Sequence, residues 1–333
     1  MAGSRLRPRQ RKLTNFQILL VVVAAVLALL LLGWVLLFRA PEQKPQLPQD
    51  ALEDVIGSAD LTEEEMAALR SHYERKKDFY TILVSGVDSS AGGSDTNILV
   101  AVDAGGNCIY GVSIPRDTKT IINGKARKIN AAYAVGGMDL LADVVSEQLG
   151  IPVDYTVQVD LKGFEALVDE IGGVDFNIPV DMDYDDPYQD LSIHFEKGLR
   201  HLNGEEALKV VRFRHNNDGT GYGSEDIGRM RTQQNFLKAV AKQTLTVSNL
   251  GKMDEFVKIF QTYVKTDLTL GNLAWLGKEA VSIGAENLEF STLPGTWKSP
   301  YIYLDREKTL QLINEHLNPY VEDRRMEDLK LPS

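Results

Sequence analysis

An uncharged run near the N-terminus limits how this chain can fold more than any other feature. Residues 16–38 read FQILLVVVAAVLALLLLGWVLLF and include no charged side chain. A helix rises about 1.5 Å per residue, so the run spans roughly 34 Å, more than the roughly 30 Å hydrocarbon core of a bilayer. A cleaved signal peptide is the alternative, but its apolar region is shorter and is followed by an A-x-A-like site, which is missing here. We therefore expect one transmembrane helix over residues 16–38.

The residues before this run set its expected orientation. Residues 1–15 carry five basic side chains and no acidic one. Short segments rich in Lys and Arg stay on the cytoplasmic side of a membrane. No second apolar run of spanning length follows. We therefore expect a single-pass protein of the cell membrane, with a cytoplasmic N-terminus and an extracellular domain.

The charge of the remainder restricts its partners. Six of the 36 basic residues and none of the 47 acidic ones lie in residues 1–39, so the remainder has 30 basic residues and a formal charge of −17. This balance argues against nucleic acid as a partner and against a broad basic surface on anionic lipid. Cys108 is the only cysteine, which excludes disulfides and cysteine-based metal sites. We expect it to be a buried core thiol, because it lies in the apolar segment CIYGVSIP.

The part after the apolar run divides into a stalk and one domain. Residues 39–76 begin with a stretch rich in Pro, Gln and acids, which predicts an extended stalk from about residue 40 to 60. A helix should follow, with Thr62 and Glu65 forming a capping box, and Asn203 and Glu206 should form a second capping pair at the start of a later helix. Residues 77–333 are expected to form a single extracellular domain.

The domain is expected to be of the α/β class. The segments FYTILVSGVD, NILVAVDA and CIYGVSIP are apolar, β-branched and bounded by Gly, Asp or Pro, as in central strands covered on both faces. Further strands and amphipathic helices alternate after them, which favours a layered α/β domain. The expected helices cover residues 139–150, 161–173, 203–210, 227–245, 253–263, 272–283 and 306–316, and the further strands cover 154–160, 174–180 and 288–293.

Polar side chains cluster where the first three strands meet their loops. Asp88 ends the first strand, Asp95 precedes the second, and Arg116 follows the third. If the first and third strands are parallel, with an antiparallel neighbour between them, all three residues lie at one end of the sheet. Two carboxylates with water and phosphate suit Mg²⁺ or Mn²⁺. The alternative is that both aspartates only form turns.

Four arginines occur in the segment VRFRHNNDGTGYGSEDIGRMRTQQ of an otherwise acidic chain. Guanidinium groups bind phosphate oxygens with a planar fork, so the clustering indicates a specific anionic ligand. Asp226 can cap the following helix, with Arg229 and Gln233 on the same face near its N-terminus. Arg212 and Arg214 would face one side if the chain is extended there. A solvated charged face with internal ion pairs is the alternative.

Lys128 and Asn130 can either reach a phosphate or close a loop. The chain lacks a GxSxG elbow, a Walker loop and a GxGxxG segment after a strand. Acyl transfer and nucleotide-dependent kinase chemistry therefore lose support.

An ordered set of motifs resembles a known family. The segments GVD, SDT, SIPRDT, KINAAYAVGG, LKGFEALVDEIGGVDFNIP, LNGEEALKVVRFRH and DIGRMRTQQ are similar to the LytR–CpsA–Psr family of bacterial cell-envelope glycopolymer transferases, over a motif core of residues 79–245. The resemblance implies a three-layer α/β/α domain with a central mixed sheet. It further implies an apolar pocket that holds a polyprenyl chain, with a pyrophosphate at its mouth.

The resemblance also implies an activity. A glycopolymer phosphate unit would pass from a polyprenyl-pyrophosphate-linked donor to a hydroxyl of peptidoglycan, the acceptor, by Mg²⁺-assisted phosphoryl transfer. One alternative is a polyprenyl pyrophosphate phosphatase on the same site, with water as acceptor. Another is a non-catalytic envelope protein that binds glycopolymer or regulates its synthesis. The polymer itself, whether teichoic acid, capsular polysaccharide or another, stays open.

Roles of individual residues follow from the resemblance. Asp88 and Asp95 match the metal-associated aspartates of the family. The residues that match pyrophosphate-binding positions are Arg116, Lys128, Arg212, Arg214, Arg229 and Gln233. The candidate catalytic residues are Arg116, Asp117, Asp226 and Arg229, with Asp117 or Asp226 as the base.

The chain departs from the family pattern in three places. Gly93 and Thr232 stand where the family commonly has arginine, and NNDGTGYGSE is inserted between RFRH and DIGR. Arg231 precedes Thr232, but its direction on a helix differs by about 100°. We expect these differences to change pyrophosphate affinity and substrate preference more than the class of reaction.

Overall fold

The computed structural model describes residues 38–44, 62–88, 93–188, 191–222, 225–244 and 253–332. The basic tail and nearly all of the apolar run lie outside this part. The backbone of Asp88, Asp95 and Asp226 is described, but their side chains are not. None of the helices formed by the described residues has the length and apolar character to span a bilayer. The transmembrane helix and its orientation therefore stay predictions.

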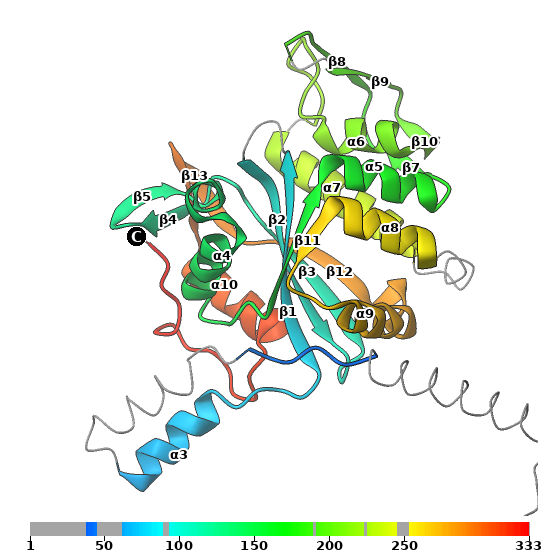
Figure 1. Cartoon of the computed structure of the whole chain (residues 1–333). Coiled ribbons are helices and arrows are strands. Elements are labelled where there is room, and N and C mark those ends of the chain that lie inside the picture. The colour runs from blue at the N-terminus through cyan, green and yellow to red at the C-terminus, as the bar shows by residue number, and fades with distance from the viewer. Residues whose placement is uncertain are drawn as a thin grey trace, which may run out of the picture.

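A six-stranded mixed sheet forms the centre of the domain (Figure 1). Two parallel pairs, β1 with β6 and β3 with β12, lie on either side of β2, which is antiparallel to both β1 and β3. This arrangement confirms the predicted α/β class and mixed sheet. In spatial order the strands are β11 (Val264–Thr266), β6 (Tyr155–Asp160), β1 (Phe79–Asp88), β2 (Gly93–Asp103), β3 (Cys108–Ile114) and β12 (Leu288–Thr292).

Helices lie on both faces of the sheet, as the apolar strands predict. Alternation along the strands sends Leu83, Leu99 and Val112 to one face, where they pack against α4 (Asn130–Leu149) and the residues around α10 (Arg306–Leu312). Ile82 and its neighbours on the other face pack against α9 (Leu270–Ile283), and α8 (Met253–Tyr263) lies above α9 in Figure 1. The result is the three-layer architecture.

A second core lies beyond one end of the sheet. It is built around Phe236 of α7, which is fully buried against Phe176 and Phe164. Figure 1 shows this group of elements above the sheet. They are α5 (Leu161–Glu170), β7 (Val174–Ile178), β8 (Met182–Asp186), β9 (Leu191–Phe195), β10 (Gly198–Leu202), α6 (Gly204–Arg212) and α7 (Glu225–Thr244).

Both capping boxes predicted from the sequence are present. Thr62 and Glu65 exchange hydrogen bonds at the start of α3 (Glu63–His72). Asn203 and Glu206 do the same at the start of α6. In each box two N–H groups that a helix leaves unsatisfied gain side-chain acceptors. Local hydrogen bonding was therefore sufficient to place these two helix ends.

The helix predicted over residues 139–150 is present, as the part of α4 that follows a break in the backbone. α4 starts at Asn130, and the backbone breaks at Gly136 and Gly137 inside it. Gly137 has φ +69°, a left-handed conformation that glycine adopts without steric cost. Two helices meet at this break, and the first of them, which starts at Asn130, was not predicted.

Three short hairpins were not predicted from the sequence. They are β4 (Lys119–Ile122) with β5 (Lys125–Lys128), β8 with β9, and β13 (Gly295–Lys298) with β14 (Tyr301–Leu304). Strands of four or five residues give too little alternation to separate them from loops.

The expectation for Cys108 was wrong. The residue is exposed, as the first residue of β3 and the partner of Asp103 across a tight turn. Apolar neighbours predict burial for a strand interior, but the strand's first residue lies beyond the edge of the core.

The predicted stalk is also wrong for its first residues. Pro41 is buried against the domain. The Glu42 N–H donates to the Tyr155 hydroxyl, which in turn donates to the Glu42 carbonyl. The Gln43 amide donates to two backbone carbonyls, one of them that of Phe79. Residues 38–44 therefore form a strap across the end of the sheet where β1 begins (Figure 1).

One buried carboxylate fastens this strap. Asp154 has no exposed surface and accepts hydrogen bonds from the Thr81 N–H at 2.9 Å and from the Lys44 N–H at 2.9 Å. Arg75 adds a two-pronged ion pair, with nitrogen–oxygen distances of 2.8 and 3.1 Å. Asp154 precedes β6, so it links the strap, the segment after α3 and the starts of two central strands.

Replacement of Asp154 tests this arrangement. Asp154→Ala should lower the free energy of unfolding by about 3–5 kcal/mol, because the Arg75 charge and several N–H groups stay buried without their partner. Asp175→Ala is the matched control, since Asp175 is largely exposed in its pair with His201 and should contribute less than about 1 kcal/mol. Urea unfolding curves measure both. Equal effects of the two substitutions would contradict the role of Asp154.

Candidate functional site

The ends of three strands bring predicted site residues to one end of the sheet. Asp88, the last residue of β1, pairs with Gly93, the first residue of β2. A register shift after Gly86 leaves Asp95 as an extra residue in β2, and such bulges turn side chains toward new directions. Because β3 is parallel to β1, Arg116 follows at the same end. The predicted convergence is therefore confirmed for the backbone.

The loop after β3 is held against the start of α4. The Asn130 N–H donates to the Arg116 carbonyl at 3.2 Å, and the Ile129 N–H donates to the Thr118 carbonyl at 2.8 Å. The Lys128 Nζ lies 2.9 Å from Asp117 Oδ1, while Arg116 Nε lies 3.7 Å from the same oxygen. Asp117 thus positions two cations, and both cationic side chains keep more than a third of their surface exposed.

Hydrogen bonds from two glutamines hold α6 and α7 at this same end of the sheet. The Gln234 amide donates to the Thr292 hydroxyl at 2.8 Å, and Thr292 pairs with Ser113 near the end of β3. The Gln233 amide donates to the carbonyl of Val211 in α6 at 2.9 Å. Through this bond the amide nitrogen of Gln233 ties two helices together, and its predicted contact with pyrophosphate stays a prediction. These bonds fix the N-terminal half of α7, including the half-buried Arg229, beside the strand ends.

Arg212 and Arg214 are not arranged as predicted. Arg212 is the last residue of α6 and is half-buried, and the backbone is extended only from Phe213 onward. Arg214 follows as an exposed residue. The two side chains therefore belong to a helix end and a loop, where the period-2 rule of a strand does not apply.

The predicted cap of α7 also differs. The helix begins at Glu225, so Asp226 lies within its first turn and not before it. A negative charge at this place is still stabilised by the positive end of the helix dipole. The role of its side chain stays a prediction.

The inserted segment supplies a residue that the sequence did not reveal as part of the site. Tyr222 packs its ring against Phe213 at 5.4 Å, and its hydroxyl is buried without a hydrogen-bond partner. Burial raises the pKa of this hydroxyl, while the neighbouring Thr232 hydroxyl and the Arg229 charge partly offset the rise. A buried donor of this kind beside Arg229 is suited to hydrogen-bond an anionic oxygen.

The same insertion explains one departure from the family pattern. Thr232 is buried and donates its hydroxyl to the Gly228 carbonyl at 3.0 Å. Tyr222 lies so close to α7 that a Cβ on Gly228 would meet the Tyr222 Cβ at 2.4 Å. The space beside this turn of the helix is therefore filled by Tyr222, and the small Thr232 fits under it. Arg231 points to solvent and does not replace an arginine at 232.

Two further buried hydroxyls lack partners at this end of the sheet. They are Ser94 Oγ, which precedes Asp95, and Thr118 Oγ1, which follows Asp117. Buried polar groups almost always find a partner, which here would be water or a ligand. Hydroxyl oxygens beside two aspartates are the type of ligand that a hard cation such as Mg²⁺ prefers. Among side chains that the structure describes, no group of three metal-ligating residues is present, but the side chains of Asp88 and Asp95 are outside that set.

An incompletely covered apolar face extends from the site. The valines Val84, Val100 and Val157 lie on the sheet face that carries α9, and they remain partly exposed. Phe290 and side chains of α7 and α9 surround them. A surface of this kind suits a long hydrocarbon chain.

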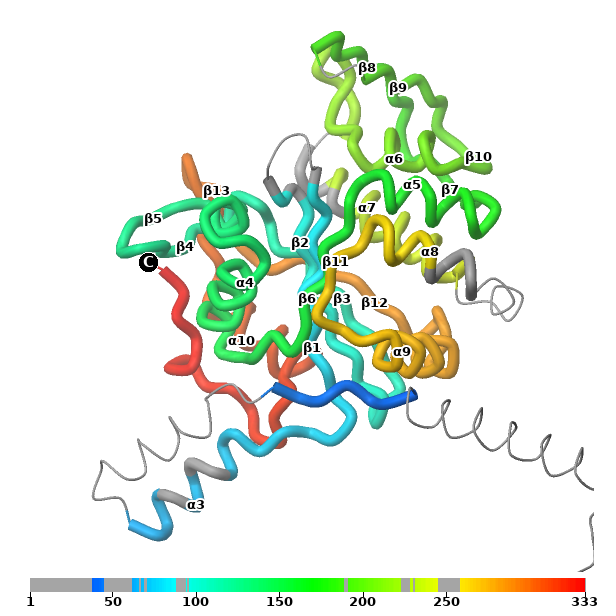
Figure 2. Tube along the Cα trace, in the orientation of Figure 1, coloured from blue at the N-terminus to red at the C-terminus, as the bar shows by residue number. Residues whose placement is uncertain are grey.

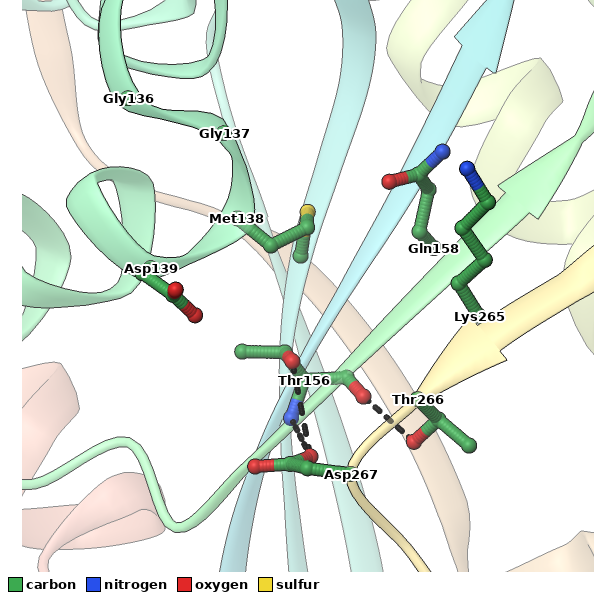
Figure 3. Close-up of a pocket in the computed structure, with 9 residues that line it drawn as sticks. All are labelled: Gly136, Gly137, Met138, Asp139, Thr156, Gln158, Lys265, Thr266 and Asp267. Atoms are coloured by element: carbon green, nitrogen blue, oxygen red, sulfur yellow. Dashed lines mark hydrogen bonds between the residues drawn. The ribbon is translucent and has the colours of Figure 1, made fainter.

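A cavity of about 370 Å³ on the other side of the sheet has a different character (Figure 3). It lies between the glycine break of α4 and the edge formed by β6 and β11. Gln158 and Lys265 line it, and Asp267 accepts a hydrogen bond from the Thr156 N–H. These polar side chains make it unsuitable for a polyprenyl chain.

The contact between the insertion and α7 can be tested by substitution. Gly228→Ala should destabilise the protein by about 1–3 kcal/mol, because the new Cβ must displace the Tyr222 side chain. Gly277→Ala in α9 is the control, since nothing lies within 4 Å of its Cβ position and Ala stabilises helices by up to about 1 kcal/mol. Thermal and urea unfolding measure both. A stabilising Gly228→Ala substitution would show that Tyr222 is not packed there.

Comparisons with known proteins agree with this geometry. Residues 53–319 match the model of the LytR_cpsA_psr family. The chain is 37% identical over 225 residues to the polyisoprenyl-teichoic acid–peptidoglycan teichoic acid transferase TagU of Bacillus cereus, a match that covers 66% of this chain and 70% of the relative. It is 32% identical to the corresponding transferase TagV of Bacillus subtilis, over 74% of this chain and 66% of the relative.

Solved structures share the fold. The crystal structure of B. subtilis TagV superposes with a TM-score of 0.62 at 31% identity, covering 74% of this chain and all of that chain. TagT bound to LIIa-WTA gives a TM-score of 0.57 at 28% identity, covering 72% of this chain and 89% of the other. The family match covers most of the chain, and the motifs that suggested it meet at one end of the sheet. The chain belongs to the LytR–CpsA–Psr family.

Proposed function

We propose that this protein is a transferase that attaches a teichoic acid polymer to peptidoglycan. The donor would be the polymer linked to a polyprenyl pyrophosphate. The observation that carries the proposal is the convergence of the Arg116 loop and the ends of α6 and α7 at one end of the sheet, in a chain whose relatives TagU and TagV are named for this transfer.

The arginines would neutralise charge on the phosphates during the reaction. A hydroxyl oxygen of the acceptor forms a new bond to the phosphorus that carries the glycan. The phosphoanhydride bond breaks, and polyprenyl monophosphate leaves with the bonding electrons. Phosphoryl transfer depends mainly on positioning and on such charge neutralisation. We assign this role to Arg116 and Arg229, with Lys128, Arg212 and Arg214 as further contacts to the pyrophosphate.

The proton of the attacking hydroxyl needs an acceptor. Asp117 already holds Arg116 and Lys128 in place, so we propose that it acts mainly by positioning these cations. Asp226 lies in the first turn of α7, three residues before Arg229, and is the better candidate for the base. The buried Tyr222 hydroxyl would donate a hydrogen bond to a phosphate oxygen.

We propose that Asp88 and Asp95 hold Mg²⁺ at the ends of β1 and β2. The bulge at Asp95 and the unpartnered hydroxyls of Ser94 and Thr118 support an oxygen-rich site there. A bound Mg²⁺ supplies positive charge that neutralises the phosphate oxygens. Mn²⁺ has similar ligand preferences and would serve as well.

The donor's lipid and the membrane complete the proposal. The polyprenyl chain would lie on the partly exposed apolar face around Val84, Val100 and Val157. The uncharged run at 16–38 would anchor the protein as a single helix, with the described domain outside the cell. The strap at 38–44 would then hold the start of β1 toward the membrane.

Removal of one arginine tests the site. Arg229→Ala should lower the rate of transfer from a synthetic lipid-pyrophosphate donor by about 10²–10³-fold, as loss of a charge-stabilising group does elsewhere. Arg231→Ala, two residues along the same helix but exposed, should stay within about threefold of the wild type. Circular dichroism and the melting temperature should confirm that both variants are folded. Near-wild-type transfer by Arg229→Ala would refute the assignment.

The nature of the products distinguishes transfer from hydrolysis. Mass spectrometry should find polyprenyl monophosphate together with peptidoglycan that carries the glycan phosphate. Free glycan phosphate without attachment would instead indicate a phosphatase, and binding without turnover would indicate a non-catalytic protein.

Metal removal tests the proposed Mg²⁺ site. EDTA should abolish transfer, and added Mg²⁺ should restore it. Asp88→Asn or Asp95→Asn should raise the Mg²⁺ concentration for half-maximal rate by at least about tenfold, because each loses a charged oxygen ligand. Asp103→Asn, at the opposite end of β2, is the control and should leave the Mg²⁺ dependence unchanged. Full activity in EDTA would rule out a metal-assisted reaction.

A further inference from the structure

Two of the unpredicted hairpins stand side by side next to the candidate site. The hairpin of β13 and β14 packs on that of β4 and β5: Thr118 and Ile302 form a parallel bridge, and the Tyr301 hydroxyl donates to the Ala126 carbonyl at 3.2 Å. Figures 1 and 2 show β13 beside β4 and β5, at the margin of the domain. Neighbouring strand residues point to opposite sides, so Trp297 and Lys298 lie on the two sides of β13, and Lys119 and Arg127 on the two sides of the β4–β5 hairpin. We call the margin that the two hairpins form together the hairpin face and define it by the side chains of Lys119, Lys125, Arg127, Trp297, Lys298 and Tyr303.

The hairpin face is continuous with the site. The Ile302 N–H donates to the Asp117 carbonyl at 2.9 Å. Lys128 joins the two regions, since its Nζ lies 2.9 Å from Asp117 Oδ1 and 5.8 Å from the centre of the Trp297 ring. A molecule that extends from the pyrophosphate position past Lys128 therefore reaches Trp297 directly.

Aromatic rings on this surface are placed to receive a ligand. Trp297 keeps 53% of its surface exposed, and every residue of β13 is exposed. The Tyr303 ring lies beneath two cations, with Lys119 Nζ at 4.7 Å and Lys298 Nζ at 5.6 Å from its centre. An exposed tryptophan presents a flat apolar surface, with a polar N–H group at its edge, on which a sugar ring can stack.

The charge of the hairpin face is opposite to that of the rest of the domain. Residues 117–128 and 295–304 contain five cations, those of the hairpin face and Lys128, against the single carboxylate of Asp117, a net charge of +4. Residues 40–333 together carry −17. Lys125, Arg127 and Lys298 form no ion pair with any carboxylate that the structure describes. A local positive patch on an acidic domain favours a specific polyanion over general attraction.

We propose that the hairpin face binds the polymer chain of the donor, a saccharide-containing polyanion with phosphodiester groups, where it leaves the pyrophosphate. Sugar rings would stack on Trp297, and phosphates would lie against Lys125, Arg127 and Lys298. This inference rests on the proposed function, because it assigns the polymer of that same donor to a subsite. Charge selects the donor polymer over the neutral glycan backbone of peptidoglycan.

The test compares two donors in steady-state transfer assays with the full-length protein. One donor carries a poly(glycerol phosphate) chain, and the other carries only its linkage sugars. Lys125→Gln/Arg127→Gln/Lys298→Gln should raise KM for the long donor at least about tenfold and weaken its salt dependence, with kcat unchanged. Trp297→Ala should raise the same KM by about tenfold, as loss of an aromatic anchor does at other interfaces. The triple variant should leave KM for the short donor unchanged, whereas Trp297→Ala should raise it as well, because the linkage sugars supply the rings that stack on Trp297.

A matched variant removes the same charge elsewhere. Lys308→Gln/Arg325→Gln/Lys330→Gln changes three cations that pair with carboxylates near the C-terminus. It should behave as the wild type with both donors. The melting temperature of each variant shows whether it is folded.

The outcomes separate this inference from the proposed function. If the wild type transfers neither donor, the proposed function fails. If it transfers both, but the hairpin variants match the wild type with the long donor, the hairpin face does not bind the polymer. A raised KM for the peptidoglycan acceptor alone would also overturn the inference, because it would make this surface an acceptor site.

Discussion

The buried carboxylate of Asp154 is the interaction on which the arrangement of this domain depends. It accepts hydrogen bonds from Thr81 near the start of β1 and from the strap, and it pairs with Arg75. A buried charge is tolerated only where such partners surround it. Because Asp154 lies just before β6, these bonds fix the starts of the two parallel strands β1 and β6 relative to each other. The opposite ends of the same strands then meet the loops and helices of the candidate site.

The candidate site is assembled from ends of elements and not from any one segment. Strand ends provide Asp88, Asp95 and Arg116, while helix ends provide Arg212 and Arg229. The hydrogen bonds that hold these strand and helix ends together are made by uncharged amide side chains, such as those of Gln233 and Gln234. A division of this kind lets loops carry charged groups, which a packed core would exclude, while the sheet keeps their positions constant.

Much of the fold could be predicted because local signals were strong. The apolar β-branched strands, two capping boxes and the helices at residues 161–170 and 253–263 agree with the structure. The short hairpins were missed because four residues give too little periodicity. The helical turns of α4 before the break at Gly136 and Gly137 were missed because they are too short to show a clear helical period. Cys108 and the first stalk residues were misjudged because burial depends on neighbours that are distant in sequence.

The sequence by itself determined the class of fold, the family motifs and the charged residue types, since each depends on composition, spacing or local hydrogen bonding. It also determined the uncharged N-terminal run and the acidic balance of the remainder. Only the tertiary structure decided that Gln233 ties two helices, that Tyr222 fills the space above Gly228, and that two basic hairpins stand together beside Asp117. These features arise from contacts between segments far apart along the chain, and packing alone selects which such segments meet.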